Sequence, residues 1–349
     1  MPTIRDIAAH LGLSKSAVSL ALQESPRIPE TTRARVRQAA QALGYRPNPV
    51  FTQMMRAVRH SGPVRTRAIL GILHGFSESH PERSVPFHGE WVAGARERAE
   101  SLGYVVDEIW MTQPGMSARR LGSVLHARGI ASLVIAPLPE KRRIDLDWSR
   151  FSAVTAGLFL LEPRLSRVVP NHQQAMLLCL QQLMARGYQR IGFILEGWLE
   201  EFATFHFVAP FLWFQHQIGP RQVIPLFETR GHTQKEFNSW YRKHRPQAVI
   251  VTGSAGLTWL RATGARVPDE VGVVFTQSTG APAGFCSVDE QPRRLGAAAI
   301  DLVLSEASHG ERGIPANPKT VFTEIGWSEG TSLRRIGDAA KSVNLEPFL

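Results

Sequence analysis

From Ala68 to Phe275, short apolar segments alternate with longer segments of helical periodicity. The apolar segments read AILGIL, YVVDEIW, IASLVIAP, RIGFIL, VIPLF, AVIVT and VGVVF, and residues 88–102 and 117–128 have the spacing of amphipathic helices. Strands that alternate with helices in this way form parallel sheets that are wrapped by helices. So many strands predict two sheets, and therefore two lobes with a cleft between them. In such folds ligands bind at the carboxyl ends of the strands.

The composition is that of a soluble globular protein with more than one domain. The chain has 349 residues, of which 43% are hydrophobic and 20% charged. Its start does not resemble a secretory signal, and no apolar run reaches the roughly 18 residues that a membrane helix needs. We therefore expect a cytoplasmic protein that does not enter a membrane. Cys179 and Cys286 lie far apart among apolar neighbours, which favours two buried, unreactive thiols over a disulfide.

The positive charge is concentrated at the N-terminal end. Residues 1–60 hold nine basic and three acidic residues, so they contribute +6 of the formal net charge of +10. A small basic module on a nearly neutral body favours a polyanionic partner for the module, although a solvated basic surface would show the same charge.

The basic module has the pattern of three helices. Thr3 and Asp6 fit a capping box at the start of the first helix, which Gly12 would end. Ser14 is a suitable N-cap for a second helix. A third helix is predicted from Pro29 to the glycine at position 44. The residues expected to point inward are Ile7, Ala8, Leu11, Val18, Ala21, Leu22, Val36, Ala40 and Leu43.

Two helices joined by a glycine turn and followed by a third form the helix-turn-helix plan. A helix that enters the major groove needs small residues where it packs and short polar ones where it meets base edges and phosphates. In the second helix Ala17, Val18, Ala21 and Leu22 are suited to packing. The residues left to face DNA are Lys15, Ser16, Ser19 and Leu20. Many three-helix modules bind no DNA, and it is the basic excess that favours DNA here.

The same residues resemble the N-terminal signature of the lactose-repressor/galactose-repressor family of bacterial transcription regulators. The matching stretches are TIRDIAAHLGLSKSAVSLALQ and TTRARVRQAAQALGYRPNP. The resemblance implies that Lys15, Ser16 and Leu20 read bases. Leu20 departs from the arginine of many members and cannot make a bidentate contact with guanine. The residues that would contact phosphates or the minor groove are Thr3, Ser14, Ser19, Arg27, Thr32 and Asn48, and Arg5 joins the expected DNA-contacting set.

Residues 47–65 follow this head and correspond to the hinge of the family. In the family this segment folds as a helix in the minor groove and inserts an apolar wedge between base pairs, and here Met54 falls on the wedge position. Ser61, Gly62 and Pro63 also fit a flexible linker. A hinge that becomes helical only on DNA satisfies both interpretations.

Residues 66–335 resemble the regulatory core of the same family, which is related to periplasmic sugar-binding proteins. The fold class predicted is therefore an all-α helix-turn-helix head on residues 1–46, a hinge, and a two-lobed α/β core with parallel sheets. By analogy the chain crosses between the lobes near Leu160, Gln291 and Lys319. The first lobe would take about residues 66–160 and 291–318, the second about 161–290 and 319–335, and residues 336–349 would form a tail.

The expected ligand site departs from the family. His206 and Thr276 stand where sugar-binding members usually carry an arginine and an aspartate, and Gly253-Ser254 occupies a further acidic position. The usual grip on sugar hydroxyls is therefore missing, so the cleft binds a different ligand or none. The residues expected to line it are His74, Phe76, His88, Trp91, His206, Ser254, Thr276 and Gln277. For Phe76 and the aromatic residues around His206, packing in the core is the alternative role.

These observations predict a transcription regulator, most simply a repressor. As a homodimer it would bind pseudo-palindromic operator DNA, and a small molecule such as a sugar would modulate its affinity. A cleft that takes a non-sugar ligand, or none, is the alternative. An enzyme is disfavoured because the chain has no phosphate-binding loop, nucleophile elbow or metal-ligand spacing, so we expect no cofactor and no metal. The basic head and the absent export signal argue against a solute-binding protein for transport.

Overall fold

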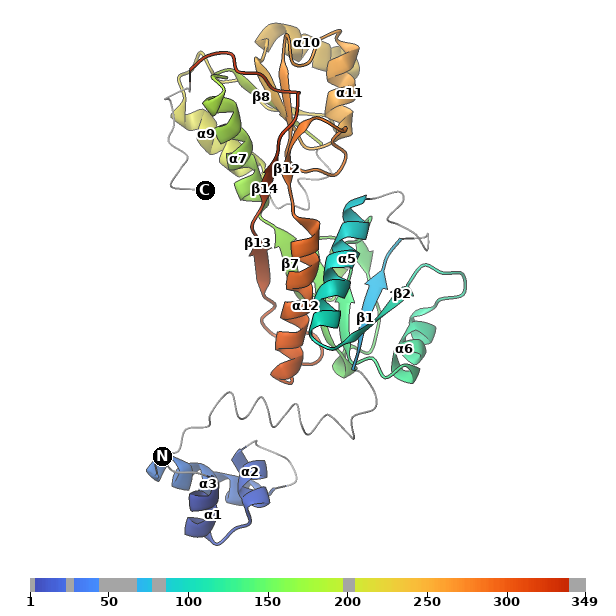
Figure 1. Ribbon diagram of the computed structural model, residues 1–349, viewed down its shortest axis with the longest axis vertical. Coiled ribbons are helices and arrows are strands. Elements are labelled where there is room, and N and C mark those ends of the chain that lie inside the picture. The colour runs from blue at the N-terminus through green and yellow to red at the C-terminus, as the bar shows by residue number, and fades with distance from the viewer. Residues whose placement is uncertain (1–3, 23–27, 44–67, 77–85, 197–204, 339–349) are drawn as a thin grey trace. The chain divides into compact units, whose positions relative to one another are not determined.

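The computed structural model describes residues 4–22, 28–43, 68–76, 86–196 and 205–338 (Figure 1). The chain divides into two compact units, residues 1–65 and residues 66–349. Several predicted features lie outside the described residues, namely the hinge on 47–65 and the DNA-contacting candidates Thr3, Arg27, Asn48 and Met54.

Three helices form the described part of the first unit: α1 (Ile4–Leu11), α2 (Lys15–Leu22) and α3 (Glu30–Ala42). One apolar face of each helix meets the others in a small core. It consists of Ile7, Ala8, Val18, Ala21, Val36, Ala39 and Ala40, with Leu11, Leu22 and Leu43 packed against it. Gly12 makes the turn between α1 and α2 with a left-handed φ of +64°. The Ser14 hydroxyl accepts the Ala17 N–H at 3.1 Å, so the predicted N-cap is confirmed.

The first lobe of the second unit is built on a parallel six-stranded sheet in the order β13-β7-β5-β3-β1-β2. Its strands are β1 (Ile69–His74), β2 (Val105–Trp110), β3 (Ser132–Ile135), β5 (Ser152–Ala156), β7 (Ser166–Pro170) and β13 (Thr320–Thr323). Helices α5 (Pro86–Ser101) and α12 (Pro292–Ser308) pack on one face, and α6 (Ala118–Ala127) packs on the other (Figure 1). Beside the sheet, β4 (Arg142–Arg143) pairs with β6 (Leu160–Glu162), and η2 (Trp148–Arg150) is a short 3-10 turn.

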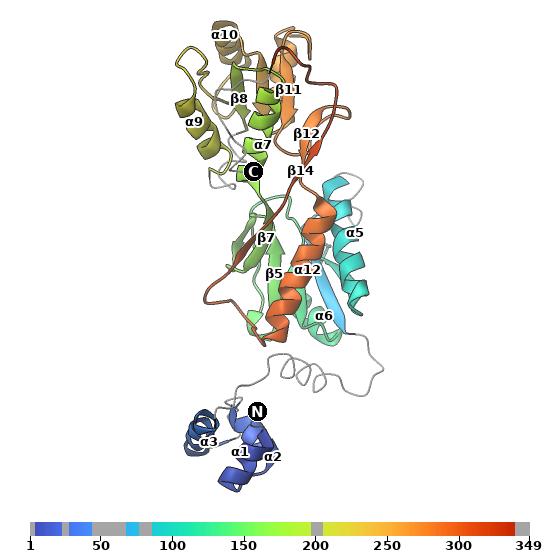
Figure 2. The ribbon, with the colours of Figure 1, turned by 60° about the vertical axis from the view of Figure 1, so that its left-hand side comes forward.

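The second lobe has its own six-stranded sheet, in the order β14-β12-β11-β10-β8-β9. Figure 2 labels β8, β11, β12 and β14 of this sheet. Its strands are β8 (Ile191–Leu195), β9 (Phe227–Glu228), β10 (Ala248–Val251), β11 (Gly272–Phe275), β12 (Cys286–Asp289) and β14 (Gly326–Ser328). Helices α7 (His172–Ala185) and α9 (Val208–Gln217) cover one face. Helices α10 (Gln234–His244) and α11 (Ser254–Ala262) cover the other. The strands are parallel except β14, which runs antiparallel to β12.

The predicted fold class is therefore confirmed, and one strand is corrected. Residues 223–227 were expected to form a strand, but only Phe227 and Glu228 pair with β8. Pro225 interrupts the segment because proline has no N–H to donate to a neighbouring strand. Its carbonyl instead accepts the Trp240 indole N–H at 2.8 Å.

The chain crosses between the sheets at places that differ partly from those predicted. It leaves the first sheet after Pro170 at the end of β7, not near Leu160. It returns between β12 and α12, where Gln291 lies, and leaves again after Thr323 at the end of β13, not near Lys319. The first crossing was placed too early because β7 follows β5 without an intervening helix. The alternation of strands and helices in the sequence therefore did not reveal β7 as a further strand of the first lobe.

The aromatic residues of α9 and of the turn before it lie partly in the core and partly on the surface. Phe207, Phe211 and Phe214 are buried in the second lobe, as the core-packing alternative predicted. Phe205 precedes α9 at a φ of +64° and is 66% exposed, so core packing does not account for it.

Helices α5 and α12 approach one another at the level of their backbones. A Cβ atom on Gly94 would lie 2.1 Å from the Arg293 carbonyl oxygen, and one on Gly296 would lie 2.1 Å from that of Trp91. Two glycines therefore create this close crossing, and it buries Trp91, Ala95, Leu295 and Ala299.

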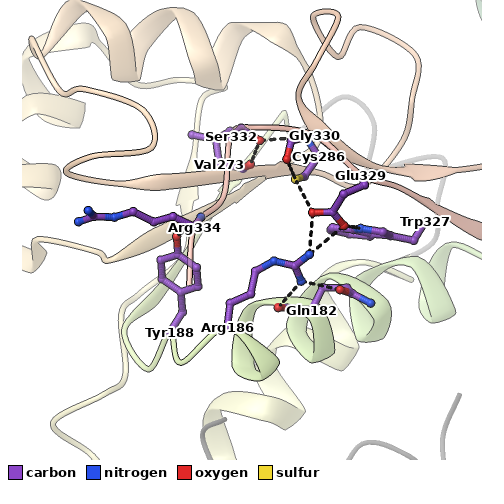
Figure 3. A network of polar contacts seen from close by, with 10 residues as sticks. All are labelled: Gln182, Arg186, Tyr188, Val273, Cys286, Trp327, Glu329, Gly330, Ser332 and Arg334. Atoms are coloured by element: carbon purple, nitrogen blue, oxygen red, sulfur yellow. Dashed lines mark hydrogen bonds and ion pairs between the residues drawn. The ribbon is translucent and has the colours of Figure 1, made fainter. Parts of the chain in front are cut away.

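Polar contacts hold residues 326–334, near the end of the described chain, against the rest of the second lobe (Figure 3). The Arg186 guanidinium, at the C-terminal end of α7, donates to both carboxylate oxygens of Glu329 at 2.8 Å. It also lies 5.7 Å from the ring centroid of Trp327, whose indole N–H donates to Glu329 at 2.6 Å. Further along, the Ser332 hydroxyl donates to the Val273 carbonyl and accepts the Cys286 N–H. The segment that returns from the first lobe thereby completes the second sheet.

Both cysteines are buried and unpaired, as predicted. Burial raises the pKa of the Cys179 thiol well above its ordinary value, which keeps it protonated and unreactive. Among the described residues, no helix combines the length and apolarity needed to cross a membrane.

Candidate nucleic-acid interface and effector cavity

The outward face of α2 carries the side chains that were predicted to contact DNA. Lys15 and Ser16, in its first turn, are exposed, whereas Ser19 and Leu20 are half-buried. Val18 and Ala21 point into the core. The helix is therefore fixed by its apolar side, and its N-terminal turn is open to solvent.

The other described candidates of the head surround this helix. Arg5 on α1 is exposed, and Thr32 on α3 is half-buried. Ser14 is exposed, and its oxygen is occupied by the Ala17 N–H. Its hydroxyl proton can still be donated to a phosphate, because a hydroxyl donates and accepts at once.

The second unit contains a cavity of about 340 Å³ where its two lobes meet. Its walls come from the segments that follow the carboxyl ends of β1, β3, β5, β7, β11 and β12, the location expected for a ligand site in this architecture. The described wall consists of Phe76, Phe87, His88, Pro137, Leu138, Pro139, Ala156, Gly157, Leu158, Phe159, Pro170, His172, Gln277, Thr279, Glu290 and Leu295.

Three of the eight predicted ligand residues, Phe76, His88 and Gln277, line this cavity. The others do not. Trp91 is buried between α5 and α12, and Thr276 is fully buried at the end of β11. Ser254 is exposed at the start of α11. His206 lies with its ring 6.0 Å from that of Phe322 on β13, and its partial burial lowers its pKa.

His74 supports the cavity wall from behind. The His74 ring is fully buried, stacks on Trp110 at 4.5 Å, and has Nδ1 3.0 Å from Nε2 of His88. Its Nε2 lies 3.0 Å from a carboxylate oxygen of Glu108, which also contacts Arg96. Because this carboxylate can only accept, it favours the His74 tautomer protonated on Nε2, and Nδ1 is then available to accept from His88. His74 therefore orients His88 and does not itself line the cavity.

Two histidines face the cavity from opposite lobes, and both are uncharged at neutral pH. Burial, followed by the nearby His74 ring, lowers the pKa of His88 to about 4. Burial, followed by His206, lowers the pKa of His172 to about 4. These imidazoles can donate or accept hydrogen bonds, but they add no positive charge near pH 7.

Glu290 is the only carboxylate in the described wall. Its side chain is 6% exposed, and its Oε2 has no hydrogen-bond partner. Burial raises the pKa of Glu290 to about 7, although hydrogen bonds from Thr279 and Ser278 oppose the increase. The cavity therefore contains a carboxyl group that changes its charge near neutral pH.

The folding stability of the protein should reflect this buried group. Since the pKa of Glu290 rises from 4.5 to about 7 on folding, the stabilisation from its protonation is present below pH 4.5 and is lost as the pH rises through 7. We expect Glu290→Gln to be more stable than the wild type at pH 8 by about 3 kcal/mol, since each unit of pKa difference corresponds to about 1.4 kcal/mol, with little difference at pH 4.5. Urea denaturation at the two pH values measures this, and a difference that does not change with pH would contradict it.

Most residues of this wall were not among those predicted from the sequence. Phe159, His172, Thr279 and Glu290 follow or end strands β5, β7, β11 and β12, of which only β11 was predicted. A signal was present in residues 286–288, a short buried segment directly before the acidic pair Asp289-Glu290. Two other carboxylates, those of Glu196 and Glu90, have structural roles. Glu196 accepts the Ala255 N–H at the start of α11, and Glu90 pairs with Arg293.

Comparisons with known families match both units. Residues 3–48 match the family described as bacterial regulatory proteins, lacI family, and residues 180–333 match the periplasmic binding protein-like domain. The HTH-type transcriptional repressor PurR of Photobacterium profundum is 22% identical over 92% of this chain and 98% of its own length. The maltose regulon regulatory protein MalI of Escherichia coli (strain K12) is 28% identical over 55% of this chain and 53% of its own.

Solved structures show the same fold. A complex of the transcriptional regulator CelR with cellobiose covers 95% of this chain and 100% of its own, with 20% identity and a TM-score of 0.52. The lac repressor dimer bound to operator and the anti-inducer ONPF covers 95% of this chain and 98% of its own, with 17% identity and a TM-score of 0.51. The chain therefore joins a head that matches the bacterial regulatory proteins of the lacI family, over residues 3–48, to a core that matches the periplasmic binding protein-like domain, over residues 180–333, which is the make-up of a DNA-binding transcription regulator.

Proposed function

We propose that this protein is a repressor that acts in the cytoplasm, binds a pseudo-palindromic operator as a homodimer, and changes its operator affinity when a small molecule occupies the cavity between the lobes. The observation that carries the proposal is the geometry of α2. Its apolar side is fixed in the head core, while Lys15 and Ser16 are exposed in its first turn. This is the arrangement in which a recognition helix presents its N-terminal residues to base edges.

The DNA-contacting residues follow from this arrangement. Lys15, Ser16 and Leu20 would read bases, and a second group would contact phosphates or the minor groove. The half-buried Leu20 would offer only an apolar surface, for example to a thymine methyl group. The second group comprises Thr3, Arg5, Ser14, Ser19, Arg27, Thr32 and Asn48, and Met54 would supply the wedge of the hinge.

The proposed control by a ligand depends on the junction of the lobes. The cavity wall takes residues from both lobes, so a bound molecule contacts each of them. A ligand shifts an equilibrium only through different affinities for the two states, typically by about 1–3 kcal/mol. The ligand would favour one lobe arrangement, and this arrangement would favour or disfavour the hinge on residues 47–65 that holds DNA.

Lys15→Ala tests the base-reading role. Duplexes selected from a random library with the full-length protein supply the operator, and fluorescence anisotropy measures its affinity. We expect the variant to bind about 5- to 150-fold more weakly, which corresponds to roughly 1–3 kcal/mol for a lost base contact.

Lys235→Ala is the matched control, because Lys235 is an exposed lysine on α10 in the second lobe. It should bind the selected duplex like the wild type. Equal losses in the two variants would show only a general effect of charge, and the assignment of α2 as the recognition helix would then be wrong.

A further inference from the structure

The described wall of the cavity is poorly suited to a polyhydroxylated ligand. Phe76, Phe87 and Phe159 line it together with Leu138 and Leu295. A sugar that entered this space would lose water from several hydroxyl groups, and each hydroxyl buried without a partner costs free energy. The rings instead favour a ligand with an apolar body. About 340 Å³ is enough for one aromatic ring with a short side chain.

The charged groups of the described wall determine the polar end of this ligand. Glu290 is the one carboxylate, and neither lysine nor arginine belongs to the described lining. His88 and His172 are uncharged near pH 7 because burial lowers the pKa of each to about 4. An anionic ligand would therefore meet no compensating positive charge from these residues, and it would be repelled by Glu290 when that group is ionised.

Glu290 is also incompletely satisfied. Its hydrogen bonds come from the loop of Ser278 and Thr279, while its Oε2 has no partner in the buried space. A buried polar atom without a partner is unfavourable, and a donor supplied by a ligand would remove this cost. A positively charged donor makes the strongest hydrogen bond to a carboxylate.

We propose that the cavity takes an organic amine with an aromatic or otherwise apolar body, its ammonium group bonded to the carboxylate of Glu290 and its body packed among Phe76, Phe87 and Phe159. This assignment rests on the proposed function, because it specifies the chemical class of the effector in the same cavity. Aromatic rings add a favourable interaction with a cation that is removed from water. The ligand is thereby distinguished from sugars and from organic acids.

The proposed binding is linked to pH. In the free protein Glu290 is largely protonated below pH 7, so the binding of an ammonium group must release its proton. Affinity should rise about tenfold from pH 6 to pH 8, as the ionised fraction of a group titrating near 7 increases. The two histidines of the wall stay uncharged in this interval, because burial lowers the pKa of His88 and of His172 to about 4. The adjacent Asp289 carboxylate accepts the Gln291 N–H at 2.9 Å.

Isothermal titration calorimetry on the full-length protein tests the proposal. The probes are benzylamine, 2-phenylethylamine and 3-phenylpropylamine, each compared with the alcohol and the carboxylate of the same carbon skeleton, and D-glucose is added as a polyol. We expect at least one amine to bind ten or more times tighter than its alcohol at pH 8, with no binding of the carboxylates. The preference should shrink at pH 6.

Two variants locate the effect. In Glu290→Gln the amine and the alcohol should bind equally, and the pH dependence should disappear. Glu140→Gln removes an exposed carboxylate next to Pro139 of the wall and should keep the wild-type preference.

Three results would overturn the proposal: no amine of any length binds, an alcohol or carboxylate binds as well as its amine, or Glu290→Gln retains the preference. If glucose binds and none of the amines does, the proposed ligand class is rejected, but the proposal of an effector cavity remains. Operator binding is measured separately, so a protein that binds amines but no DNA would reject the proposed repressor and keep the amine site.

Discussion

Affinity for the selected operator duplex is expected to fall by about a thousandfold or more when residues 1–65 are removed. The reason is the uneven distribution of charge and contacts. Residues 1–60 contribute +6 of the net charge of +10, and the head has its own apolar core, separate from those of residues 66–349. The remaining core has neither the exposed turn of α2 nor the basic excess that attracts phosphates.

Gel shifts and anisotropy at several salt concentrations measure this effect. For the full-length protein, the logarithm of the affinity should fall steeply and linearly with the logarithm of the salt concentration, because each phosphate contact releases cations from the DNA. Circular dichroism of residues 66–349 is the control, and it should show an α/β fold with an unchanged thermal transition. Residual operator binding by a folded core, or binding of the whole protein that ignores salt, would contradict the assignment of the head.

The second large effect is expected at the crossing of α5 and α12. Gly296→Ala places a Cβ atom where the Trp91 carbonyl oxygen would be 2.1 Å away. The obstacle is backbone, which cannot move aside like a flexible side chain, so the helices must separate. We expect a loss of about 3 kcal/mol in the free energy of unfolding, at the upper end of the usual cost of overpacking. Urea denaturation at constant pH measures it.

Gly122→Ala is the matched control, because Gly122 also lies within a helix, α6, but its added Cβ would meet only Leu146 at 4.0 Å. This variant should gain about 0.5–1 kcal/mol, since alanine is the better helix former. Replacing glycine with alanine is thus expected to lower the free energy of unfolding at position 296 and to raise it at position 122. A loss at Gly296 no larger than the change at Gly122 would show that α5 and α12 are not packed at backbone distance.

The crossing also affects the cavity. Phe87 and His88 belong to α5 and Leu295 belongs to α12, and all three line the wall. Ligand affinity in Gly296→Ala should therefore fall together with stability, whereas Gly122→Ala should leave it unchanged.

The three described helices of the head and the core between them could be predicted from the sequence. Its signals are local: Gly12 ends one helix, Ser14 caps the next, and apolar residues recur at helical spacing within each. Capping and periodicity act over a few residues, so they can be read along the chain without knowledge of the fold. Strands β1, β2, β3, β8, β10 and β11 of the core were predicted for the same reason, since helical segments separate most of them, whereas β13, which follows α12, was not predicted.

Which residues line the cavity was determined by the tertiary structure. Glu290 and His172 are far apart in sequence and become neighbours of one space only because β12 and β7 end where the lobes meet. His74 was expected in the cavity, but the packing of Trp110 and Glu108 placed it behind His88. Periodicity within a segment determined which residues form strands and helices. The order of the strands in each sheet, which brings distant segments together, determined which side chains share the site and which groups lose water there.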